Sequence, residues 1–394
     1  MGMDAGALLD AAKGMKDWLV EIRRSLHRIP EPGHEEVKTQ AAIAARLDGL
    51  GIEYEKKGTA IVGIVRGAKP GKTVGIRADI DALPIREERQ TDYSSTHPGY
   101  MHACGHDAHA TILLGAARFF SERRESLTGN VKFFFQPAEE TSGGAADMIR
   151  DGCLENPRVD HVIGLHVMPN VPTGSIEVKF GALNGASDTL HITVLGTGAH
   201  AAYPDLGIDA IMIAGHLVTA LHSLVSRYVS PLDSAVLTIG AISGGAKSNI
   251  IADEVRMKAT LRTTDPAVEE RILSLVGALV ESIPKAFGGS GELSVERGYR
   301  SLINHDGAVR TILATAENLL GKDRILFKEK PSMGVEDFSY FLMEREGAFY
   351  HLGCMNREKG ITAPPHNGRF DIDEDCLPIG VAMHAGITLS LLGA

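Results

Sequence analysis

The apolar run VKFFFQ, residues 131–136, is a clear strand candidate, and similar runs lie before and after it along the chain. These runs are AIVGIVRG (60–67), TVGIRADI (73–80) and HVIGLHV (161–167). Short β-branched and aromatic runs next to glycines are typical of buried strands. A helical pattern over residues 106–124 lies between the runs 73–80 and 131–136, and another over 143–151 lies between 131–136 and 161–167. Strands that alternate with helices predict a sheet with helices on its faces.

Two further helices are predicted before these strands. Apolar side chains recur at helical spacing over residues 7–28, and IPEPG (29–33) stops this pattern with two prolines and a glycine. A second helix is predicted over residues 35–50, where Gly49 and Gly51 mark its end.

From residue 183 the pattern changes to a second kind of domain. Four strand-like runs and two helical stretches follow in the order β-α-β-β-α-β, which is the ferredoxin-like arrangement. The strands are TLHITVLG (189–196), SAVLTIGAIS (234–243), ADEVRMKATLRT (252–263) and GELSVERGY (291–299), and the helices cover 207–228 and 266–287. We therefore predict one domain of residues 1–182 and 298–394, interrupted by an inserted domain of residues 183–297.

Composition narrows the class of protein. The 394 residues carry 50 acidic and 40 basic side chains, a net charge of −10 that gives no reason to expect nucleic acid or anionic lipid as a partner. No window approaches eighteen uninterrupted apolar residues, and no signal peptide is predicted at the N-terminus. Four cysteines are too few for a disulfide scaffold, so a reduced, cytoplasmic enzyme is expected.

The segment MHACGHDAH, residues 101–109, contains three histidines, one cysteine and one aspartate. Cys104 and His106 are two residues apart, so a loop entering a helix can direct both side chains at one point. A thiolate and an imidazole are good ligands for Zn²⁺, Co²⁺, Ni²⁺ or Mn²⁺, whereas thiolate disfavours Mg²⁺ and Ca²⁺. The alternative is a set of helix-start histidines hydrogen-bonded in a core, and the segment alone does not say which histidines bind metal.

Glu139 and Glu140, in QPAEET (136–141), follow the strand 131–136 directly. Two adjacent carboxylates beside a core strand raise each other's pKa unless a cation lies nearby. One of them can bind a metal while the other holds the attacking water as a general base. A solvated loop is the alternative interpretation.

Two histidines and two aspartates lie where they could join this site. His166 ends the strand 161–165, at the edge where ligands of α/β proteins gather. His366 follows two prolines in PPHNGRFDIDED (364–375), and Asp79 and Asp81 end another strand, where one could support a ligand histidine. Taken singly, each of these histidines is better explained by a structural role than by metal binding. For each aspartate, a simple turn at the end of the strand is as good an explanation as a supporting role.

Three motifs with other functions are incomplete. HEEVK (34–38) lacks the second histidine of a helical zinc-protease site, and GAKPGKT (67–73) is one residue short of a phosphate loop. GTGAHA (196–201) imitates a dinucleotide fingerprint but has no acidic partner. A nucleotide-dependent oxidoreductase or ligase is therefore disfavoured.

Together these segments resemble one family over nearly the whole chain. The matching motifs are LHRIPEPGHEE, IRADIDALPI, MHACGHDAH, FFFQPAEE, GLHVMP, HAAYPD, SMGVEDFSYF and PPHNGRFDIDED, in this order. They are similar to the amidohydrolase branch of the aminoacylase and carboxypeptidase-type dinuclear metallohydrolases, which includes hippurate hydrolases and N-acetyl-diaminopimelate deacetylases. The resemblance implies an α/β, zinc-peptidase-like catalytic domain with a mixed sheet flanked by helices, plus an inserted ferredoxin-like α+β lid domain.

The resemblance also implies roles for particular residues. Two divalent metal ions (Mn, Zn, Co or Ni) would be held by five ligands, with the thiolate as the bridge: Cys104, His106, Glu140, His166 and His366. Glu139 would be the general base, and His200 of the lid would stabilise the oxyanion, within its own chain or across a dimer. Asn249 and Arg262 would hold the carboxylate of the substrate, and the SMGVEDFS loop with Glu336 and Asp337 would line the active-site side. A homodimer or homotetramer is expected, with the lid as a possible dimerisation domain.

Departures from the family pattern lie in or next to the lid. Relatives usually have Gly-Lys-Gly-Gly-His where this chain has Gly-Thr-Gly-Ala-His at 196–200, and His where it has Asp205. The common Met-Ala-Ala before the first lid strand is replaced by Asn-Gly-Ala at 184–186. The metal motifs match the family pattern, so these departures are expected to affect which substrate is preferred and not the metal chemistry.

The leading hypothesis is a metal-dependent hydrolase of N-acyl amino acids or dipeptide-like amides with a free carboxylate. One alternative is a metallo-carboxypeptidase or dipeptidase that acts on unblocked peptides. The other is a catalytically silent binding or scaffold protein, which would usually have lost the base or a ligand. Glu139 and all five candidate ligands are present.

Overall fold

The structure, a computed structural model, describes residues 5–393 and consists of two compact units. The first contains the described residues up to Gly181, residues 303–329 and residues from Asp337 onward. The second contains residues 182–302 and 330–336. A short two-stranded sheet of β7 (Gly181–Asn184) and β12 (Leu302–Asn304) lies where the chain passes from one unit to the other.

The first unit is built on an eight-stranded mixed sheet with the strand order β1-β2-β4-β3-β5-β14-β6-β13. Its strands are β1 (Glu53–Lys57), β2 (Ala60–Arg66), β3 (Lys69–Asp79), β4 (Thr128–Gln136), β5 (His161–Pro172), β6 (Ile176–Val178), β13 (Ile325–Phe327) and β14 (Glu346–Met355). The central strands β4, β3, β5 and β14 are parallel, whereas β1 and β2 are antiparallel to their neighbours. The carboxyl ends of β3, β4 and β5 therefore lie at one edge of the sheet.

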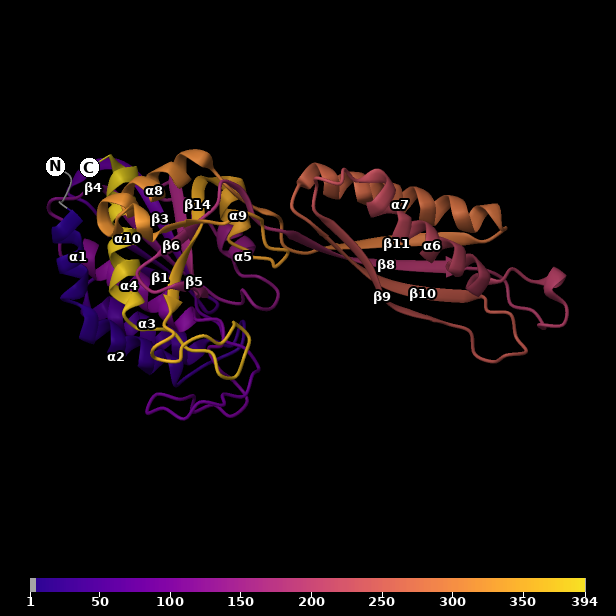
Figure 1. Cartoon of the computed structure of the whole chain (residues 1–394), viewed down its shortest axis with the longest axis horizontal. Helices are drawn as coiled ribbons and strands as arrows, with labels where there is room; N and C mark the ends of the chain where they lie inside the picture. Colours follow the sequence, from indigo (N-terminus) through magenta and orange to yellow (C-terminus); the bar gives the residue numbers. More distant parts are fainter. Residues whose placement is uncertain (1–4, 394) are drawn as a thin grey trace. The chain divides into compact units, whose positions relative to one another are not determined.

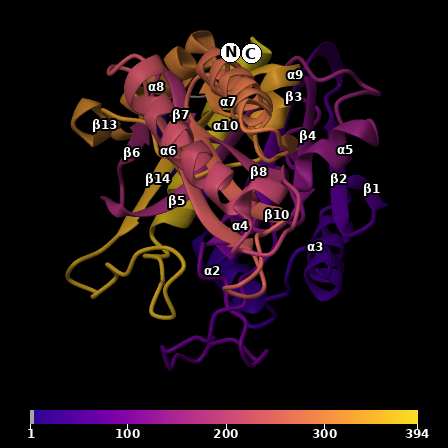
Figure 2. The ribbon, with the colours of Figure 1, turned by 90° about the vertical axis from the view of Figure 1, so that its right-hand side faces the viewer.

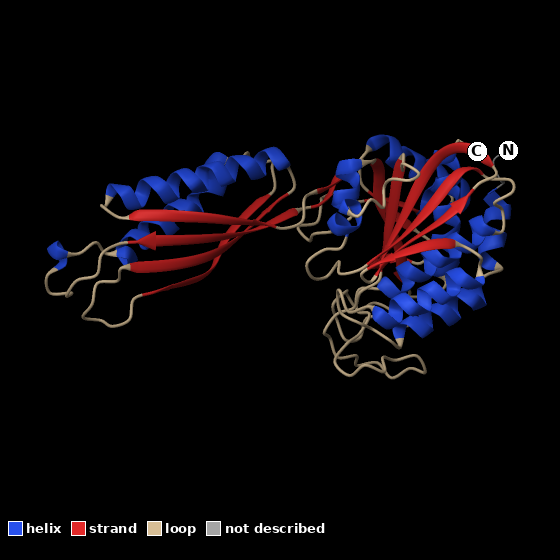
Figure 3. Cartoon of the chain, turned by 180° about the vertical axis from the view of Figure 1, so that it is seen from behind, coloured by secondary structure: helices blue, strands red, loops and turns tan. Residues whose placement is uncertain are grey.

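Helices cover both faces of this sheet, as Figures 1 and 3 show. They are α1 (Ala5–Lys13), α2 (Lys16–His27), α3 (Val37–Gly49), α4 (His106–Ser121), α5 (Ala145–Arg150), α8 (Asp306–Leu320), α9 (Ser339–Glu344) and α10 (Cys376–Leu392). Side chains alternate across β4: Phe133 and Phe135 join the main core, while Phe134 stacks on Phe341 of α9, with ring centroids 5.4 Å apart. The predicted α/β class with a mixed sheet flanked by helices is confirmed.

The N-terminal helix differs from the sequence prediction. The single helix predicted over residues 7–28 is broken into α1 and α2 at Gly14. The amide of Gly14 still donates to the carbonyl of Asp10, at 2.9 Å, but the helix then stops. Glycine costs about 1 kcal/mol in a helix interior, and the break lets Met15 turn into the core.

A buried arginine joins three distant parts of the first unit. Arg23 of α2 is fully buried, and its guanidinium donates to Asp107 at 2.9 Å and to Asp371 at 2.8 Å. Asp107 lies in the first turn of α4, and Asp371 lies five residues after His366. Although burial alone would lower it, the charges of Asp107 and Asp371 raise the pKa of Arg23 well above its usual range. The guanidinium therefore ties α2 to both segments.

Replacing Arg23 by Met is expected to lower the free energy of unfolding by about 3–5 kcal/mol, because Asp107 and Asp371 would then be buried without their cation. Urea unfolding of the metal-free protein would measure the change. The control is Arg46→Met, which removes a partly exposed ion pair with Glu21 and is expected to cost less than about 1 kcal/mol. Equal costs for the two variants would contradict the role of Arg23.

The second unit is a four-stranded antiparallel sheet in the order β11-β8-β10-β9, with the element order β-α-β-β-α-β. Its elements are β8 (Ala186–Leu195), α6 (Ala210–Tyr228), β9 (Ala235–Gly244), β10 (Glu254–Thr263), α7 (Pro266–Ala286) and β11 (Ser290–Arg297), with a short 3-10 helix at Pro204–Leu206. Helices α6 and α7 lie side by side on one face of this sheet (Figure 2). Buried and exposed residues alternate along β10, as expected of a sheet with one covered face.

Among the described helices, α6 is the one long and apolar enough to cross a membrane by length and composition. Its inner face packs on the sheet as part of the core of the second unit. The buried residues of this face are Ala210, Ile213, Ala214, Leu217, Leu221 and Leu224. This one-sided burial is that of an amphipathic helix packed on a sheet.

Candidate metal centre

Side chains with metal-binding chemistry meet at the carboxyl edge of the central strands of the first unit. Asp79, the last residue of β3, pairs with Gln136, the last residue of β4. His166 lies within the adjacent strand β5, which continues to Pro172 instead of ending at residue 165 as predicted. Cys104 lies just before α4, and His106 is the first residue of this helix. The fold thus brings residues more than 60 positions apart to one edge of the sheet, as the sequence predicted for parallel strands.

The five candidate ligands form two triads of donor atoms that share one residue. The first triad is Cys104, His106 and His166, and the second is Cys104, Glu140 and His366. Within each triad all donor atoms lie within 4.8 Å of one another. The Sγ of Cys104 is 3.3 Å from Nε2 of His166, and Oε1 of Glu140 is 3.0 Å from Nε2 of His366. A thiolate common to both triads is the geometry that a bridging ligand between two ions requires.

Asp81 holds one member of each triad. Its Oδ1 is 3.0 Å from Nδ1 of His106, and its Oδ2 accepts a hydrogen bond of 2.9 Å from the backbone amide of Glu140. His106 therefore presents Nε2 to the centre, where this buried nitrogen has no hydrogen-bond partner. The sequence left the roles of Asp79 and Asp81 open, and the structure places Asp81 behind the candidate ligands.

The electrostatics of the site fit a bound cation. Although burial alone would lower it, the charge of Asp79 and a hydrogen bond to Asp81 raise the pKa of His106 to about 10. Burial, together with the charge of Glu140, raises the pKa of the Cys104 thiol well above its usual range. A thiolate at this position, beside these carboxylates, therefore needs a cation next to it. Sulfur, imidazole and carboxylate together form the donor set of a zinc-like divalent ion.

The backbone is constrained where the candidate ligands are held. His366 itself and Ala138, just before the two glutamates, have positive φ angles of 59° and 61°. Gly105, between Cys104 and His106, has a φ of 91°, and a Cβ there would lie 2.4 Å from a methyl group of Val167. Non-glycine residues held at positive φ are concentrated at functional sites, where the surrounding structure offsets the strain.

Glu139 lies beside both triads and is buried, with 8% of its surface exposed. A carboxylate oxygen of Glu139 lies within 4.8 Å of the donor atoms of His106 and Glu140. This position next to the candidate ligands is where a base would reach a water on the metal centre.

Asp337, expected on the active-site side, is fully buried and bonded on several sides. It accepts hydrogen bonds from Arg77 at 2.7 Å, from the side-chain amide of Gln136 and from the backbone amides of Gly144 and Ala145. These bonds fix the loop that follows Glu139 and Glu140.

Comparison with known proteins identifies the family. The model of peptidase family M20/M25/M40 matches residues 75–390. The chain belongs to this family. It is a metal-dependent hydrolase, and the resemblance inferred from the motifs is confirmed.

Relatives of this M20 chain carry names from two activity classes. It is 40% identical to N-acetyldiaminopimelate deacetylase of Priestia megaterium, over 90% of this chain and 94% of the relative. It is 34% identical to thermostable carboxypeptidase 1 of Saccharolobus solfataricus, over 96% of each chain. The structure matches a dinuclear metal-binding peptidase of the M20 family from Bacillus subtilis with a TM-score of 0.84 and 29% identity, over 97% and 99% of the two chains.

The candidate catalytic residue His200 and the candidate substrate-binding residues Asn249 and Arg262 of this M20 chain lie at opposite ends of the second unit's sheet. The loops of His200 and Asn249 run side by side, since the amide of Ala201 donates to the carbonyl of Asn249 at 3.1 Å. They lie beyond the end of the sheet where Glu254 pairs with Leu195. Arg262 pairs with Ser187, eight residues along β10, which is roughly 26 Å at the rise of a strand. The structure brings His200 and Asn249 together and places Arg262 apart from them.

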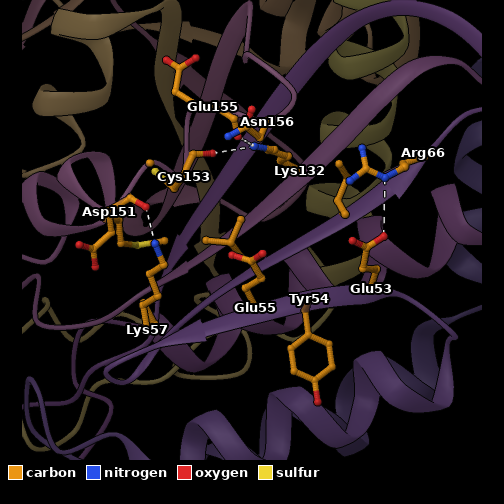
Figure 4. Close-up of a pocket in the computed structure, with 15 residues that line it drawn as sticks. Glu53, Tyr54, Glu55, Lys57, Arg66, Lys132, Asp151, Cys153, Glu155 and Asn156 are labelled. Carbon is orange, nitrogen blue, oxygen red and sulfur yellow. Dashed lines mark hydrogen bonds and ion pairs between the residues drawn. The ribbon is translucent and has the colours of Figure 1, made fainter.

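A pocket of about 220 Å³ elsewhere in the first unit lies over β1, β2 and β4 (Figure 4). None of the five candidate ligands lines it. Its cations are paired: Lys132 donates to the carbonyls of Cys153 and Glu155, and Lys57 donates to the carbonyl of Asp151. The pocket therefore contributes nothing to the metal centre.

Proposed function

We propose that this enzyme hydrolyses the amide bond of N-acyl amino acids or related small amides that carry a free carboxylate. The observation that supports this most directly is the pair of donor triads sharing Cys104, with Glu139 beside them. Two divalent ions are proposed, with the first held by Cys104, His106 and His166, and the second by Cys104, Glu140 and His366.

The bound ions would supply two things, a lower pKa for a water molecule and a positive charge next to the amide carbonyl oxygen. The thiolate favours Mn²⁺, Zn²⁺, Co²⁺ or Ni²⁺ over Mg²⁺ or Ca²⁺. The chain's own residues perform the proton transfers. Glu139 takes the proton of the attacking water and returns it to the nitrogen of the leaving amine. Its burial keeps bulk water away from this exchange.

The second unit is proposed to act as a lid that binds the substrate. Arg262 suits the free carboxylate, since its planar guanidinium binds two oxygens at once. His200 would donate to the oxyanion that develops on the amide carbonyl. Because the end of the sheet nearest His200 and Asn249 lies roughly 26 Å along β10 from Arg262, we infer that one chain does not supply both groups to one small substrate. His200 and Asn249 would come from the partner in a homodimer.

Replacing His200 by Ala is expected to lower kcat by about 10²–10³, the usual loss for one oxyanion donor. Mixed dimers distinguish the two arrangements. If His200 acts across the dimer, mixing inactive His200→Ala chains with inactive Glu139→Gln chains restores one active site in each mixed dimer. Activity is measured after the subunits exchange, with each variant alone as the control. No recovery in verified mixed dimers would contradict the trans arrangement.

A metallo-carboxypeptidase or dipeptidase on unblocked peptides is the second candidate, supported by the relatives named carboxypeptidases. It uses the same metal centre but needs a free amino group in the substrate. The four cysteines are all free thiols, which supports a cytoplasmic location for either enzyme.

Amine release from a panel of N-acyl amino acids and free dipeptides tests the proposal. The chain is reconstituted with Mn²⁺, Co²⁺ or Zn²⁺, and chelator-treated protein is the control. Chelator-sensitive release from the blocked substrates is the expected result. Release from unblocked dipeptides alone would favour the peptidase, and no release with metal bound would contradict both.

A further inference from the structure

One backbone amide beside a candidate ligand is paired with a histidine instead of a strand. The pairing of β5 with β3 ends at Gly164, opposite Arg77, three residues before Val167. Beyond this point β5 is no longer paired with β3, although β3 itself continues to Asp79. The amide of Val167 donates instead to Nε2 of His109, at 2.9 Å. His109 thus takes the place of the missing strand in a fully buried part of the sheet edge.

This contact determines which nitrogen of His109 carries the proton. A backbone amide can only donate, so Nε2 must be the acceptor, and Nδ1 carries the hydrogen. Nδ1 lies 2.5 Å from Oδ1 of Asp79, whose other oxygen accepts from Arg77 at 2.7 Å. Both nitrogens of His109 are therefore used.

The two hydrogen bonds of His109 also argue against a metal site at the third cluster of ligand-type residues. Asp79, His106 and His109 also have donor atoms within 4.8 Å of one another. Binding an ion through His109 would break its bond to Val167 or its bond to Asp79. No lone pair of His109 is left for a metal.

The carbonyl of Val167 holds the neighbouring candidate ligand in the same way. Nδ1 of His166 lies 2.8 Å from this oxygen, which can only accept, so Nδ1 of His166 carries the hydrogen. Its Nε2 is then left with a lone pair directed toward Cys104, 3.3 Å away. Val167 thus joins the rings of His109 and His166 through its amide and its carbonyl, and the centroids of these two rings are 4.6 Å apart.

We propose that His109 is a positioning residue for the metal centre: through the backbone of Val167 it fixes the rotamer and the tautomer of His166. The inference rests on the proposed function, since it takes His166 as a metal ligand. His109 itself touches neither metal nor substrate. The chain of contacts runs from Arg77 through Asp79 and His109 to the part of β5 that carries His166. Partners of this kind typically contribute 10–100-fold to metal affinity.

Three variants separate the two bonds of His109. In His109→Gln the amide oxygen reaches the position of Nε2 and can still accept from Val167. In His109→Asn the side chain is too short for Val167 but keeps a donor near Asp79, and His109→Ala loses both. His384→Gln is the control, because His384 is also a buried histidine but contacts the hydroxyl of Tyr350.

Co²⁺ titration, followed by the thiolate-to-cobalt absorption band and by calorimetry, gives the affinity for each ion. We expect His109→Asn and His109→Ala to bind one of the two ions 10–100-fold more weakly, with two ions still bound at saturation. The affinity for the other ion should change less than about threefold, and His109→Gln should recover most of the loss. His384→Gln should leave both affinities unchanged. Unchanged affinities in all His109 variants, or one ion fewer at saturation, would overturn the proposal.

The tautomer of His109 is measured separately on the metal-free chain. Long-range proton–nitrogen spectra of the histidine rings should show His109 protonated at Nδ1 and bare at Nε2. Protonation at Nε2 would overturn the inference. Wild-type protein that binds no Co²⁺ would contradict the proposed function instead, and this spectrum would still decide the hydrogen bonds of His109.

Discussion

Glu139→Gln is expected to bind two metal ions with nearly unchanged affinity while kcat falls by about 10²–10⁴, the usual contribution of a general base. The substitution keeps the size of the side chain and removes its ability to take a proton from water. Glu139 belongs to neither of the triads that share Cys104, so the ions should remain. Turnover of a reactive N-acyl amino acid and metal content by atomic absorption measure the two quantities.

The control for this variant is Glu122→Gln, at the exposed C-terminal end of α4. It makes the same chemical change away from the site and should leave kcat as in wild type. If Glu139→Gln keeps wild-type turnover, Glu139 is not the base. If it loses metal as well as turnover, Glu139 is a ligand.

Cys104→Ser is expected to weaken the binding of both ions and to reduce activity in proportion to the metal lost. Cys104 is the residue common to the two triads, so its removal takes one donor from each ion. A serine hydroxyl has the same shape but does not ionise to replace a thiolate. The measurement is metal content per chain after dialysis at a fixed free Zn²⁺ concentration.

Cys153→Ser is the matched control, because Cys153 is also a buried free thiol but lies in the pocket over β1, β2 and β4. Its metal content should equal that of wild type. Unchanged metal content in Cys104→Ser would show that the thiolate is not a ligand. Loss of only one ion would show that it does not bridge.

Most of the strands and helices could be predicted from local patterns of apolar residues in the sequence. The runs at 60–67, 73–80, 131–136 and 161–167 lie in strands in the structure because they are apolar, β-branched or aromatic, although the strand that begins at His161 continues to Pro172. The β-α-β-β-α-β order of the second unit was predictable for the same reason: α6 has one apolar stripe, and buried and exposed residues alternate along β10.

Elements without such a pattern were not predicted. Strand β1, EYEKK, is almost wholly polar because it forms the exposed edge of the sheet. Helix α10 is apolar on all sides because it is buried in the core, so it has no amphipathic period. The break at Gly14 depends on the packing of Met15, which a window of sequence does not contain.

The candidate ligands could be found from sequence because cysteine, histidine and glutamate are concentrated in short motifs at strand and helix ends. What sequence could not give is the division of labour among neighbours. His106 and His109 stand three residues apart in one motif, yet one faces a donor triad and the other is bonded on both nitrogens. This difference depends on where the pairing of β3 with β5 ends, which is a property of the sheet. Arg23, which holds α4 and the loop of His366, carries no local signal either.

The catalytically silent alternative finds no support in the site. All five candidate ligands converge, Asp81 orients two of them, and Glu139 lies next to them. A scaffold that had lost its activity would be under no constraint to retain the strained backbone at Ala138 and His366.

The most direct test of the account is a crystal structure of the Zn²⁺-loaded protein with anomalous diffraction measured at the zinc edge. We expect two peaks per chain, both about 2.3 Å from the Sγ of Cys104, with His106 and His166 on one ion and Glu140 and His366 on the other. A single peak, or a peak between Asp79 and His109, would contradict it.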